Sequence, residues 1–343
     1  MHVRRLFQPI VVFVTLVSAS WLFMTPSPAA EKIRVRLDWV PWGSHAPIHL
    51  AAQKGVFAKH GLEVETDDGN GSVTAVQIVG NGEYDIGFAS LAPMAIARSK
   101  GLPVVAIAGL VRQNDIGLLV PADGGIKTPA DLKGKTIAAT ASSIEAPFID
   151  TFLAAGKLTR NDVEVLNVDA AAKAGTYIAG RADGAFSSVP FFLPLAKKQR
   201  PSISINFQDY GLEFPSFGLL VTEKKLSERR AALAKFASIV SGMWAYTFNG
   251  HEDEAVAAMI AARPQAKLDP TAVRGQIDSL KAFAYTAATK NLPFGTMAAS
   301  DWKRAVEVLG DGSLVNKSLD PNSLYTNDLL DTNLIGELAA GKL

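Results

Sequence analysis

The stretch Ile33-Arg-Val-Arg-Leu-Asp-Trp39, continued by Val-Pro-Trp-Gly-Ser-His45, opens the first of three consecutive strand-turn-helix units. Its alternating β-branched residues predict a strand, the Pro and Gly of the continuation predict a turn, and the Ala- and Leu-rich run that follows predicts a helix. Residues 62–80 and 84–101 repeat this order. The series favours an α/β fold in which strands and helices alternate.

The turns of these units are candidate ligand contacts, because the crevice of an open α/β sheet lies beyond the carboxyl ends of its strands. The first turn carries two Trp and a His. The second, Asp67-Asp-Gly-Asn-Gly-Ser72, presents free backbone N–H groups and ends in a Ser suited to cap the next helix. The third turn contains Ser90.

A second strand-turn-helix series starts at Lys135, with a strand over 135–140, a turn at 141–143 and a helix over 144–155. Two segments of similar composition, Ile116 to Val120 and Ser216 to Val221, flank this series, and we interpret them as hinge crossings. The expected fold is therefore α/β and two-lobed, with a βα sheet sandwich in each lobe. The expected boundaries are 31–118 and 216–343 for lobe 1 with its C-terminal helices, and 119–215 for lobe 2.

Residues 1–30 differ from the rest of the chain. Arg4 and Arg5 precede an almost wholly apolar stretch over 10–24, and a Pro- and Ala-containing segment follows it. This order is typical of a secretory signal peptide cleaved after Ala29 or Ala30. A membrane anchor is the alternative, but a span needs about 18 apolar residues, and polar residues interrupt this shorter run. We expect the mature protein in the periplasm.

Composition excludes several kinds of site and partner. The 343 residues are 48% hydrophobic and 20% charged, as in an ordinary soluble α/β protein, and contain no Cys, which rules out disulfides and thiolate metal sites. Without residues 1–30 the net charge changes from +1 to −1. No Lys/Arg-rich block or RNA-binding motif is present, so we expect no nucleic-acid partner.

Enzyme and metal signatures are weak. The Gly-x-Ser-x-Gly and Gly-x-x-x-x-Gly-Lys-Ser/Thr motifs are absent, and Gly69-Asn-Gly71 is too short for a dinucleotide fingerprint. His45 and His49 have the spacing of a zinc pair, but Ala46 stands where a His-Glu-x-x-His motif requires Glu. We therefore predict no catalytic residue, no metal and no cofactor.

The predicted ligand site combines strand ends from both lobes with a residue near the hinge. Neutral donors and aromatic rings dominate the set, which suits a small polar or aromatic solute. The aromatic residues could equally belong to the core, and the Asp and Ser residues could be plain helix caps. The candidates are Asp38, Trp39, Trp42, Ser44, His45, Gly71, Ser72, Ser90, Thr140, Ser142, Ser143, Glu145, Ser187, Ser188 and Tyr210.

Several segments resemble the periplasmic substrate-binding proteins of ABC importers, in the group for nitrate, sulfonate, taurine and thiamine-pyrimidine precursors. The resemblance spans about residues 31–225. The Asp-Trp pair followed by a loop His is most similar to the thiamine-pyrimidine branch. The matching segments are Leu37-Asp-Trp39, Lys54-Gly-Val-Phe57, Gly61-Leu-Glu-Val64, Gly82-Glu-Tyr-Asp-Ile-Gly87, Ala97 to Ala108 and Ile126 to Gly134.

The resemblance implies a type II periplasmic binding protein that holds a small heterocycle, such as a thiamine pyrimidine precursor, between its lobes. It further implies an inner-membrane ABC permease as partner, and we expect a monomer. A sulfonate, nitrate or aromatic carboxylate is the alternative ligand, because Pro41-Trp42-Gly43-Ser44 departs from the pattern of the pyrimidine binders and Arg112 offers a positive charge. A pyrimidine-synthase-like enzyme is the alternative from another class, although the resemblance would then imply a Cys-rich motif.

Overall fold

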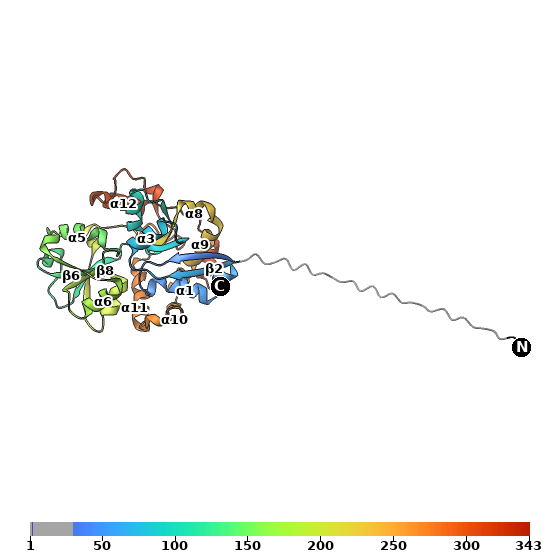
Figure 1. The fold of residues 1–343 in the computed structure, drawn as a ribbon, viewed down its shortest axis with the longest axis horizontal. Helices are drawn as coiled ribbons and strands as arrows, with labels where there is room; N and C mark the ends of the chain where they lie inside the picture. Colours follow the sequence, from blue (N-terminus) through green and yellow to red (C-terminus); the bar gives the residue numbers. More distant parts are fainter. Residues whose placement is uncertain (1, 3–29) are drawn as a thin grey trace.

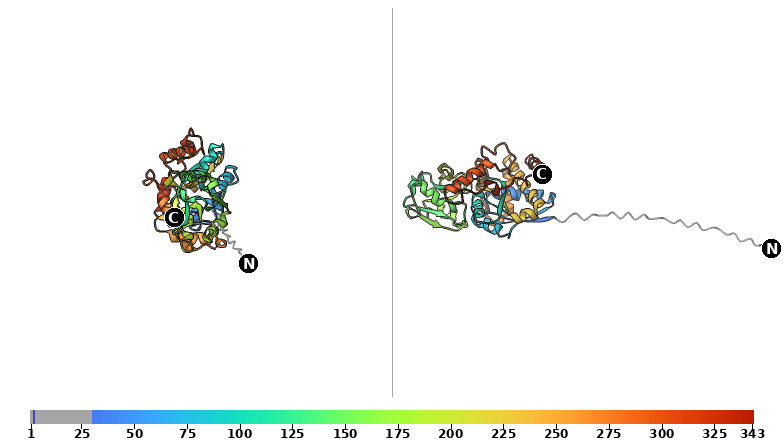
Figure 2. Two further views of the ribbon diagram at one scale, coloured as in Figure 1. Left: turned by 90° about the vertical axis from the view of Figure 1, so that its left-hand side faces the viewer. Right: turned by 90° about the horizontal axis from the view of Figure 1, so that it is seen from above.

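The computed structural model describes residue 2 and residues 30–343, which fold into two lobes side by side (Figure 1). Apart from residues 2 and 30, the predicted signal peptide lies outside the described residues. Each lobe is built around one five-stranded sheet. The view from above in Figure 2 shows the same two lobes, with the C-terminal segment on the larger one.

The sheet of lobe 1 has the order β2-β1-β3-β10-β4. Strand β1 pairs in parallel with β2 and β3, whereas β10 is antiparallel to both of its neighbours. In this sheet, the side chains of β3, β4 and β10 are buried on both faces, which explains the almost continuous apolar sequences of these strands. The strands are β1 (Glu31–Arg36), β2 (Leu62–Asp67), β3 (Ile86–Ser90), β4 (Val104–Gly109) and β10 (Phe217–Thr222).

The sheet of lobe 2 repeats this topology in the order β7-β6-β8-β5-β9. Strand β6 is parallel to β7 and β8, and β5 is antiparallel to β8 and β9. Thus each sheet contains one antiparallel strand, contributed by a segment that adjoins a crossing. The strands are β5 (Ile116–Pro121), β6 (Thr136–Ala139), β7 (Glu164–Asn167), β8 (Gly184–Ser188) and β9 (Ser202–Asn206).

The chain passes from one sheet to the other through residues 110–115 and 211–216. Strand β5 pairs with lobe 2 from Ile116 onward, so the chain enters lobe 2 slightly before the expected boundary after residue 118. The segments predicted as hinge crossings, Ile116 to Val120 and Ser216 to Val221, instead correspond closely to β5 and β10, the antiparallel strands that directly follow the crossings.

Most helices lie where the sequence pattern places them. One difference is the segment 144–155, where a continuous helix was expected and α5 begins only at Ile149. The preceding residues form a turn and the short η3, which contains Pro147; the Glu145 side chain, just before η3, is buried. The helices of lobe 2 are α5 (Ile149–Ala155), α6 (Ala170–Ile178) and α7 (Val189–Ala196).

The helices around lobe 1 come from both ends of the described chain. No helix within residues 30–343 combines the length and apolar composition needed to cross a bilayer. These helices are α1 (Ala46–Gln53), α2 (Val56–Lys59), α3 (Ser72–Gly80), α4 (Leu91–Ser99), α8 (Glu223–Glu228), α9 (Arg230–Phe248), α10 (Glu252–Ala262), α12 (Ala299–Asp311) and α13 (Thr332–Ala339). Short 3-10 turns complete the fold: η1 (Gly43–His45), η2 (Pro129–Leu132), η3 (Ala146–Phe148), η4 (Arg160–Asp162), η5 (Phe207–Tyr210), η6 (Pro264–Ala266), η7 (Lys281–Phe283) and η8 (Pro321–Leu324).

Helix α11 (Pro270–Leu280) differs from the expectation that the C-terminal helices cover lobe 1 alone. It packs against α7 of lobe 2 and also against η1 and α10 of lobe 1. Figure 1 shows α11 at the boundary between the lobes. The absence of a side chain at Gly275 allows α11 to pack closely against Pro194 of lobe 2. A Cβ at Gly275 would lie 3.0 Å from Pro194 Cβ, which is a tight contact.

Candidate functional site

The two sheets turn their carboxyl strand ends toward one another, and a small cavity lies between them. Its volume is about 10 Å³, which is room for about one water molecule. The lobes are therefore closed on each other, and their own side chains fill the cleft. The lining residues are Asp38, Trp39, Trp42 and Phe217 from lobe 1, and Ser143, Ile144, Ser187, Ser188 and Phe191 from lobe 2.

Aromatic rings form most of the cavity wall. The Trp42 ring meets Phe191 and Phe217 edge-on, each with ring centroids 5.6 Å apart. Trp39 meets Phe191 edge-on at 6.1 Å. The indole N–H groups of Trp39 and Trp42 are buried without a hydrogen-bond partner among the described residues. An unpaired buried donor costs free energy, so these two indole groups are unsatisfied donors in this closed arrangement.

Asp38 is the acidic group of the cavity. Its Oδ1 is 2.8 Å from His45 Nε2, and both side chains are buried. Within residues 30–343, Oδ2 of Asp38 makes no hydrogen bond. The His45 ring is held edge-on by Phe88 at 5.5 Å and by Trp42 at 5.9 Å. His45 thus orients the carboxylate from behind the cavity and does not line it; its neighbour Ser44 is likewise buried behind the wall.

Lobe 2 contributes a buried ion pair to the region. Lys173 Nζ lies 2.8 Å from Glu145 Oε1, and both side chains are fully buried. Ser143 donates its hydroxyl to Glu145 Oε2 at 2.5 Å. The Lys173 ammonium lies 4.8 Å from the centroid of the Trp39 ring in lobe 1, a cation–π contact across the cleft. Burial lowers the pKa of Lys173, and the nearby Glu145 carboxylate opposes that shift.

Asp115 lies where the two crossings meet. Its carboxylate accepts hydrogen bonds from the hydroxyls of Ser188, at the end of β8, and Ser216, at the end of the second crossing. The side chain is fully buried. Burial raises the pKa of Asp115 to about 6, although both hydroxyls act in the opposite direction. Ser188, predicted as a ligand contact, therefore lines the cavity and also connects it to the hinge.

The rim of the cleft is closed by direct contact of the start of α3 and the turn before it with the turn after β6. Val73 N donates to Ser142 O at 3.0 Å, and Ser142 Oγ donates to Asn70 O at 2.7 Å. Gly71 has a φ of +150°, and a Cβ there would lie 2.0 Å from Ser142 O. Gly71 and Ser142 are thus brought together as rim contacts.

Ser72 and Ser90 lie together below this rim in lobe 1. Ser90 N donates to Ser72 Oγ at 3.0 Å, and the Ser90 hydroxyl is buried without a partner among the described residues. This bond ties the end of β3 to the start of α3. Both residues are fully buried and neither lines the cavity.

Two predicted site residues lie away from the cavity. Thr140 Oγ1 donates to Val168 O at 2.8 Å, and its side chain faces a separate surface depression shared with Arg160 and Asn167. Tyr210 is partly buried and packs edge-on against Phe152 of the lobe 2 core, with ring centroids 5.5 Å apart. A strand-end position alone does not aim a side chain into the cleft, because neighbouring residues of a strand point to opposite faces.

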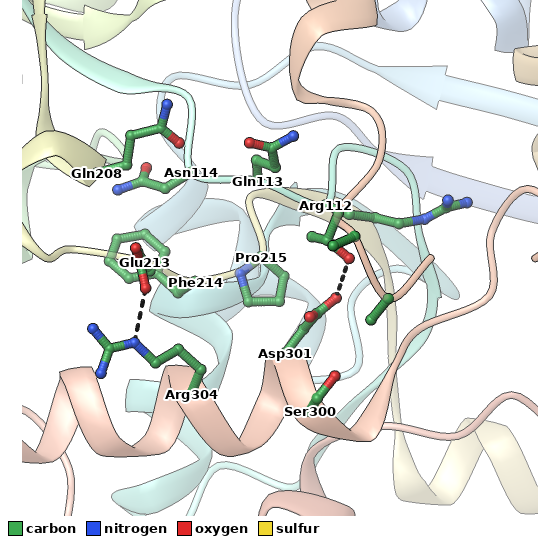
Figure 3. A pocket seen from close by; sticks show the side chains of 13 residues that line it. Arg112, Gln113, Asn114, Gln208, Glu213, Phe214, Pro215, Ser300, Asp301 and Arg304 are labelled. Atoms are coloured by element: carbon green, nitrogen blue, oxygen red, sulfur yellow. Dashed lines mark hydrogen bonds and ion pairs between the residues drawn. The ribbon is translucent and has the colours of Figure 1, made fainter. Parts of the chain in front are cut away.

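A larger cavity of about 490 Å³ lies elsewhere, between the crossings and α12 (Figure 3). Arg304 pairs with Glu213 there at 2.8 Å. Figure 3 shows the Arg112 side chain directed away from Glu213 and Asp301. The Arg112 guanidinium instead lies over the rings of Phe294 and Tyr285, at 4.6 and 5.0 Å from their centroids. Arg112 therefore supplies no positive charge to the cleft between the sheets.

The spacing of His45 and His49 does not assemble a metal site. No three His, Cys, Asp or Glu side chains of the described residues are placed to hold an ion. Burial, followed by the charges of Arg263 and His45, lowers the pKa of His49 to about 3, so this imidazole is neutral at physiological pH.

Sequence reasoning missed five residues of the region: Ile144, Lys173, Phe191, Phe217 and Asp115. Phe191 had a detectable signal, since it opens the helix that follows the predicted Ser187-Ser188 turn. Phe217 begins β10 directly after the second crossing. Lys173 is the single charge within the Ala-rich α6, a pattern that an exposed face would produce equally well.

We expect Asp115 to make stability pH-dependent. Its pKa, raised from 3.8 to about 6, makes the folded protein retain a proton that the unfolded chain has already released. The retained proton stabilises the folded protein by about 3 kcal/mol. This stabilisation is complete below about pH 3.8 and is lost as pH rises through about 6. Across this pH range, the free energy of unfolding measured with urea should fall less steeply with rising pH for Asp115→Asn than for wild type. Replacing the exposed Asp209 by Asn is the control, and equal slopes for all three proteins would contradict the assignment.

Breaking the buried pair of lobe 2 should be costly. Lys173→Met leaves the Glu145 carboxylate buried without its counterion, so the free energy of unfolding should fall by about 3–5 kcal/mol. The double variant with Glu145→Gln should recover part of this loss, because no uncompensated charge remains. The exposed pair of Lys317 and Asp311 provides the control, since Lys317→Met should change urea unfolding little. A similar effect at the two lysines would disprove the role of the buried pair.

Gly71→Ala should prevent the rim from closing. The added methyl group collides with Ser142 O, so the radius of gyration from small-angle scattering should increase. Gly82→Ala is a matched control, because Gly82 also has a positive φ, +84°, but has open space around its Cβ position. If both variants scatter like wild type, the rim contact does not limit closure.

Comparisons with known proteins agree with this architecture. A formylaminopyrimidine-binding protein of Halalkalibacterium halodurans is 27% identical over 290 residues, covering 82% of this chain and 85% of that protein. A 4-amino-5-hydroxymethyl-2-methylpyrimidine phosphate synthase of Aspergillus parasiticus is 32% identical over 110 residues, only 32% of each chain.

The alkanesulfonate-binding protein SsuA from Xanthomonas axonopodis pv. citri, solved with bound MOPS, has the same fold with a TM-score of 0.67 at 15% identity, covering 88% of this chain and 99% of that one. The predicted two-lobed periplasmic-binding-protein fold is thereby confirmed. Residues 42–255 match the family described as NMT1/THI5 like. Since the match covers more than half of the chain, this protein belongs to the NMT1/THI5-like family.

Proposed function

We propose that this protein is the solute-binding component of an ABC import system and that its solute is an aminopyrimidine related to the thiamine precursors. The observation that carries the proposal is the chemistry of the cleft, an aromatic wall with one carboxylate and two unpaired indole donors. The relative that matches 82% of this chain is named for binding formylaminopyrimidine, which supports the same class of ligand.

The lining groups complement an aminopyrimidine. Its flat ring stacks on Trp and Phe rings, and its ring nitrogens accept hydrogen bonds from indole N–H groups. Its amino group donates to a carboxylate, for which Asp38 Oδ2 is available. The Ser187 hydroxyl offers a further adaptable contact at the lobe 2 side.

The charges of the cleft disfavour nitrate, sulfonates and aromatic carboxylates. Asp38 is the charged residue of the cavity lining, and no Arg or Lys of the described chain lines it. Lys173 is already paired with Glu145, and Arg112 is enclosed by rings outside the cleft. An anion entering this cavity would meet the Asp38 carboxyl group and no Arg or Lys side chain of the lining, which is unfavourable in a buried site.

Binding requires the cleft to open, because about 10 Å³ cannot hold a pyrimidine ring. The crossings at 110–115 and 211–216 are the segments about which the lobes would separate, as in hinge closure around a ligand. The closed, loaded form would then present surfaces of both lobes to an inner-membrane permease. The same proposal places the protein in the periplasm as a monomer, with the predicted leader directing export.

Binding without turnover is the proposed activity. The synthase relatives are the second candidate, but their match extends over only 32% of this chain, whereas the binding protein matches over 82%. Recovery of the solute unchanged after prolonged incubation, measured by mass spectrometry, supports a receptor. A time-dependent conversion of the bound heterocycle supports an enzyme.

Asp38→Asn should weaken pyrimidine binding by about 10- to 100-fold, because a hydrogen bond to a charged group is worth about 1.5–3 kcal/mol. Isothermal calorimetry with formylaminopyrimidine measures the effect, with sodium nitrate and an alkanesulfonate as competing solutes. The exposed Asp311→Asn is the control and should bind like wild type. Heat from nitrate or the sulfonate, with none from the pyrimidine, would refute the proposed ligand class.

A further inference from the structure

Gln276 connects the two lobes beside the cleft. Its side-chain Oε1 accepts a hydrogen bond from Gly43 N of lobe 1 at 2.8 Å. Its Nε2 donates to Phe191 O of lobe 2 at 2.9 Å. The residue is 2% exposed, so water does not compete for either bond in this arrangement. One amide group therefore joins two backbones that belong to different lobes.

The fit around Gln276 is tight on both sides. A Cβ at Gly43 would lie 2.8 Å from Gln276 Cβ and 3.0 Å from Val273 O, so η1 lies against the backbone of α11. On the opposite side α11 packs against α7. Separation of the lobes must therefore detach α11 from at least one of its two partners.

The two backbone groups bonded to Gln276 adjoin or belong to residues of the aromatic wall. Gly43 directly follows Trp42, and the other bond is to Phe191 itself. The rings of Trp42 and Phe191 meet with centroids 5.6 Å apart. Each hydrogen bond fixes the backbone behind one ring, and the two rings approach each other only when the lobes are closed.

We infer that Gln276 is a positioning residue that fastens the closed cleft by holding Trp42 and Phe191 in register across the lobes. The inference deepens the proposed function and rests on it for the identity of the solute. The fastening itself follows from the two hydrogen bonds and the place of α11. Gln276 does not line the cavity, so its effect on binding acts through the two aromatic residues.

Gln276→Leu tests the inference, since it preserves the approximate side-chain volume and removes both hydrogen bonds. Formylaminopyrimidine should dissociate about tenfold faster from this variant, measured by stopped-flow indole fluorescence, with a smaller change in association. Ser279→Ala is the matched control on the same helix, because the Ser279 hydroxyl bonds only to Gly275 O within α11. Equal dissociation rates for wild type and Gln276→Leu would overturn the inference.

Gln276→Glu separates fastening from simple packing. At low pH the introduced carboxyl group is protonated, so it can donate to Phe191 O and accept from Gly43 N. At high pH the carboxylate can only accept and is repelled by the carbonyl. Burial at this position raises the pKa of the introduced carboxyl group above the ordinary Glu value of about 4.3, so dissociation, normalised to wild type at each pH, should be close to wild type at about pH 4.5 and faster at about pH 8. If the ratio of the Gln276→Glu dissociation rate to that of wild type did not change with pH, this would argue against the bridge formed by the two Gln276 hydrogen bonds.

Scattering without solute distinguishes failure of this inference from failure of the ligand assignment. Gln276→Leu should have a larger radius of gyration than wild type and Ser279→Ala. If formylaminopyrimidine does not bind wild type, the ligand proposal fails, while a larger radius for Gln276→Leu still supports the bridge. An unchanged radius overturns it whatever solute binds.

Discussion

The two chain crossings are held together by one buried carboxylate, and the walls of the cleft depend on it. Asp115 ends the first crossing and accepts hydrogen bonds from Ser216 of the second and Ser188 of lobe 2. A fully buried carboxylate without a cation needs all its hydroxyl donors, so these residues have little freedom. Phe217 follows Ser216 directly, and the helix of Phe191 follows Ser188. The hydrogen bonds at the hinge thus set the start of both elements that carry the aromatic wall.

Besides the ring contacts of Trp39 and Trp42 with Phe191, hydrogen bonds and a cation–π contact join the lobes at three further places. Backbone and hydroxyl hydrogen bonds join Ser142 to the turn before α3 at the rim. The Lys173 ammonium faces Trp39 in the interior. Gln276 connects η1 to α7 at the edge formed by α11. Because the contacts are spread around the cavity, they restrict the movement of one lobe relative to the other on several sides.

The strand ends of both sheets were predictable, because β-branched runs, polar turns and helix starts follow each other regularly and parallel strands share one carboxyl edge. Asp38, Trp39, Trp42, Ser143, Ser187 and Ser188 accordingly meet at one cavity. Thr140 and Tyr210 do not, since strand pleat and local packing decide where each side chain points. Lys173, Asp115 and Gln276 act through partners 28, 101 and 233 residues away, and no local pattern records such pairings.

A cleft that its own side chains fill sets a threshold for every solute that enters it. Ring contacts of Trp42 with Phe191 and Phe217 already stabilise the closed form without a solute. A solute that displaces these contacts must therefore make interactions of more favourable free energy. The apparent affinity is reduced by the fraction of molecules that are closed and inaccessible. A small ion that touches only one lobe replaces few of these contacts, so closure of the empty cleft competes with its binding more strongly than with the binding of a solute that contacts both lobes. The ring contacts that fill the cavity therefore compete most strongly with weakly bound solutes, whatever hydrogen bonds a solute makes.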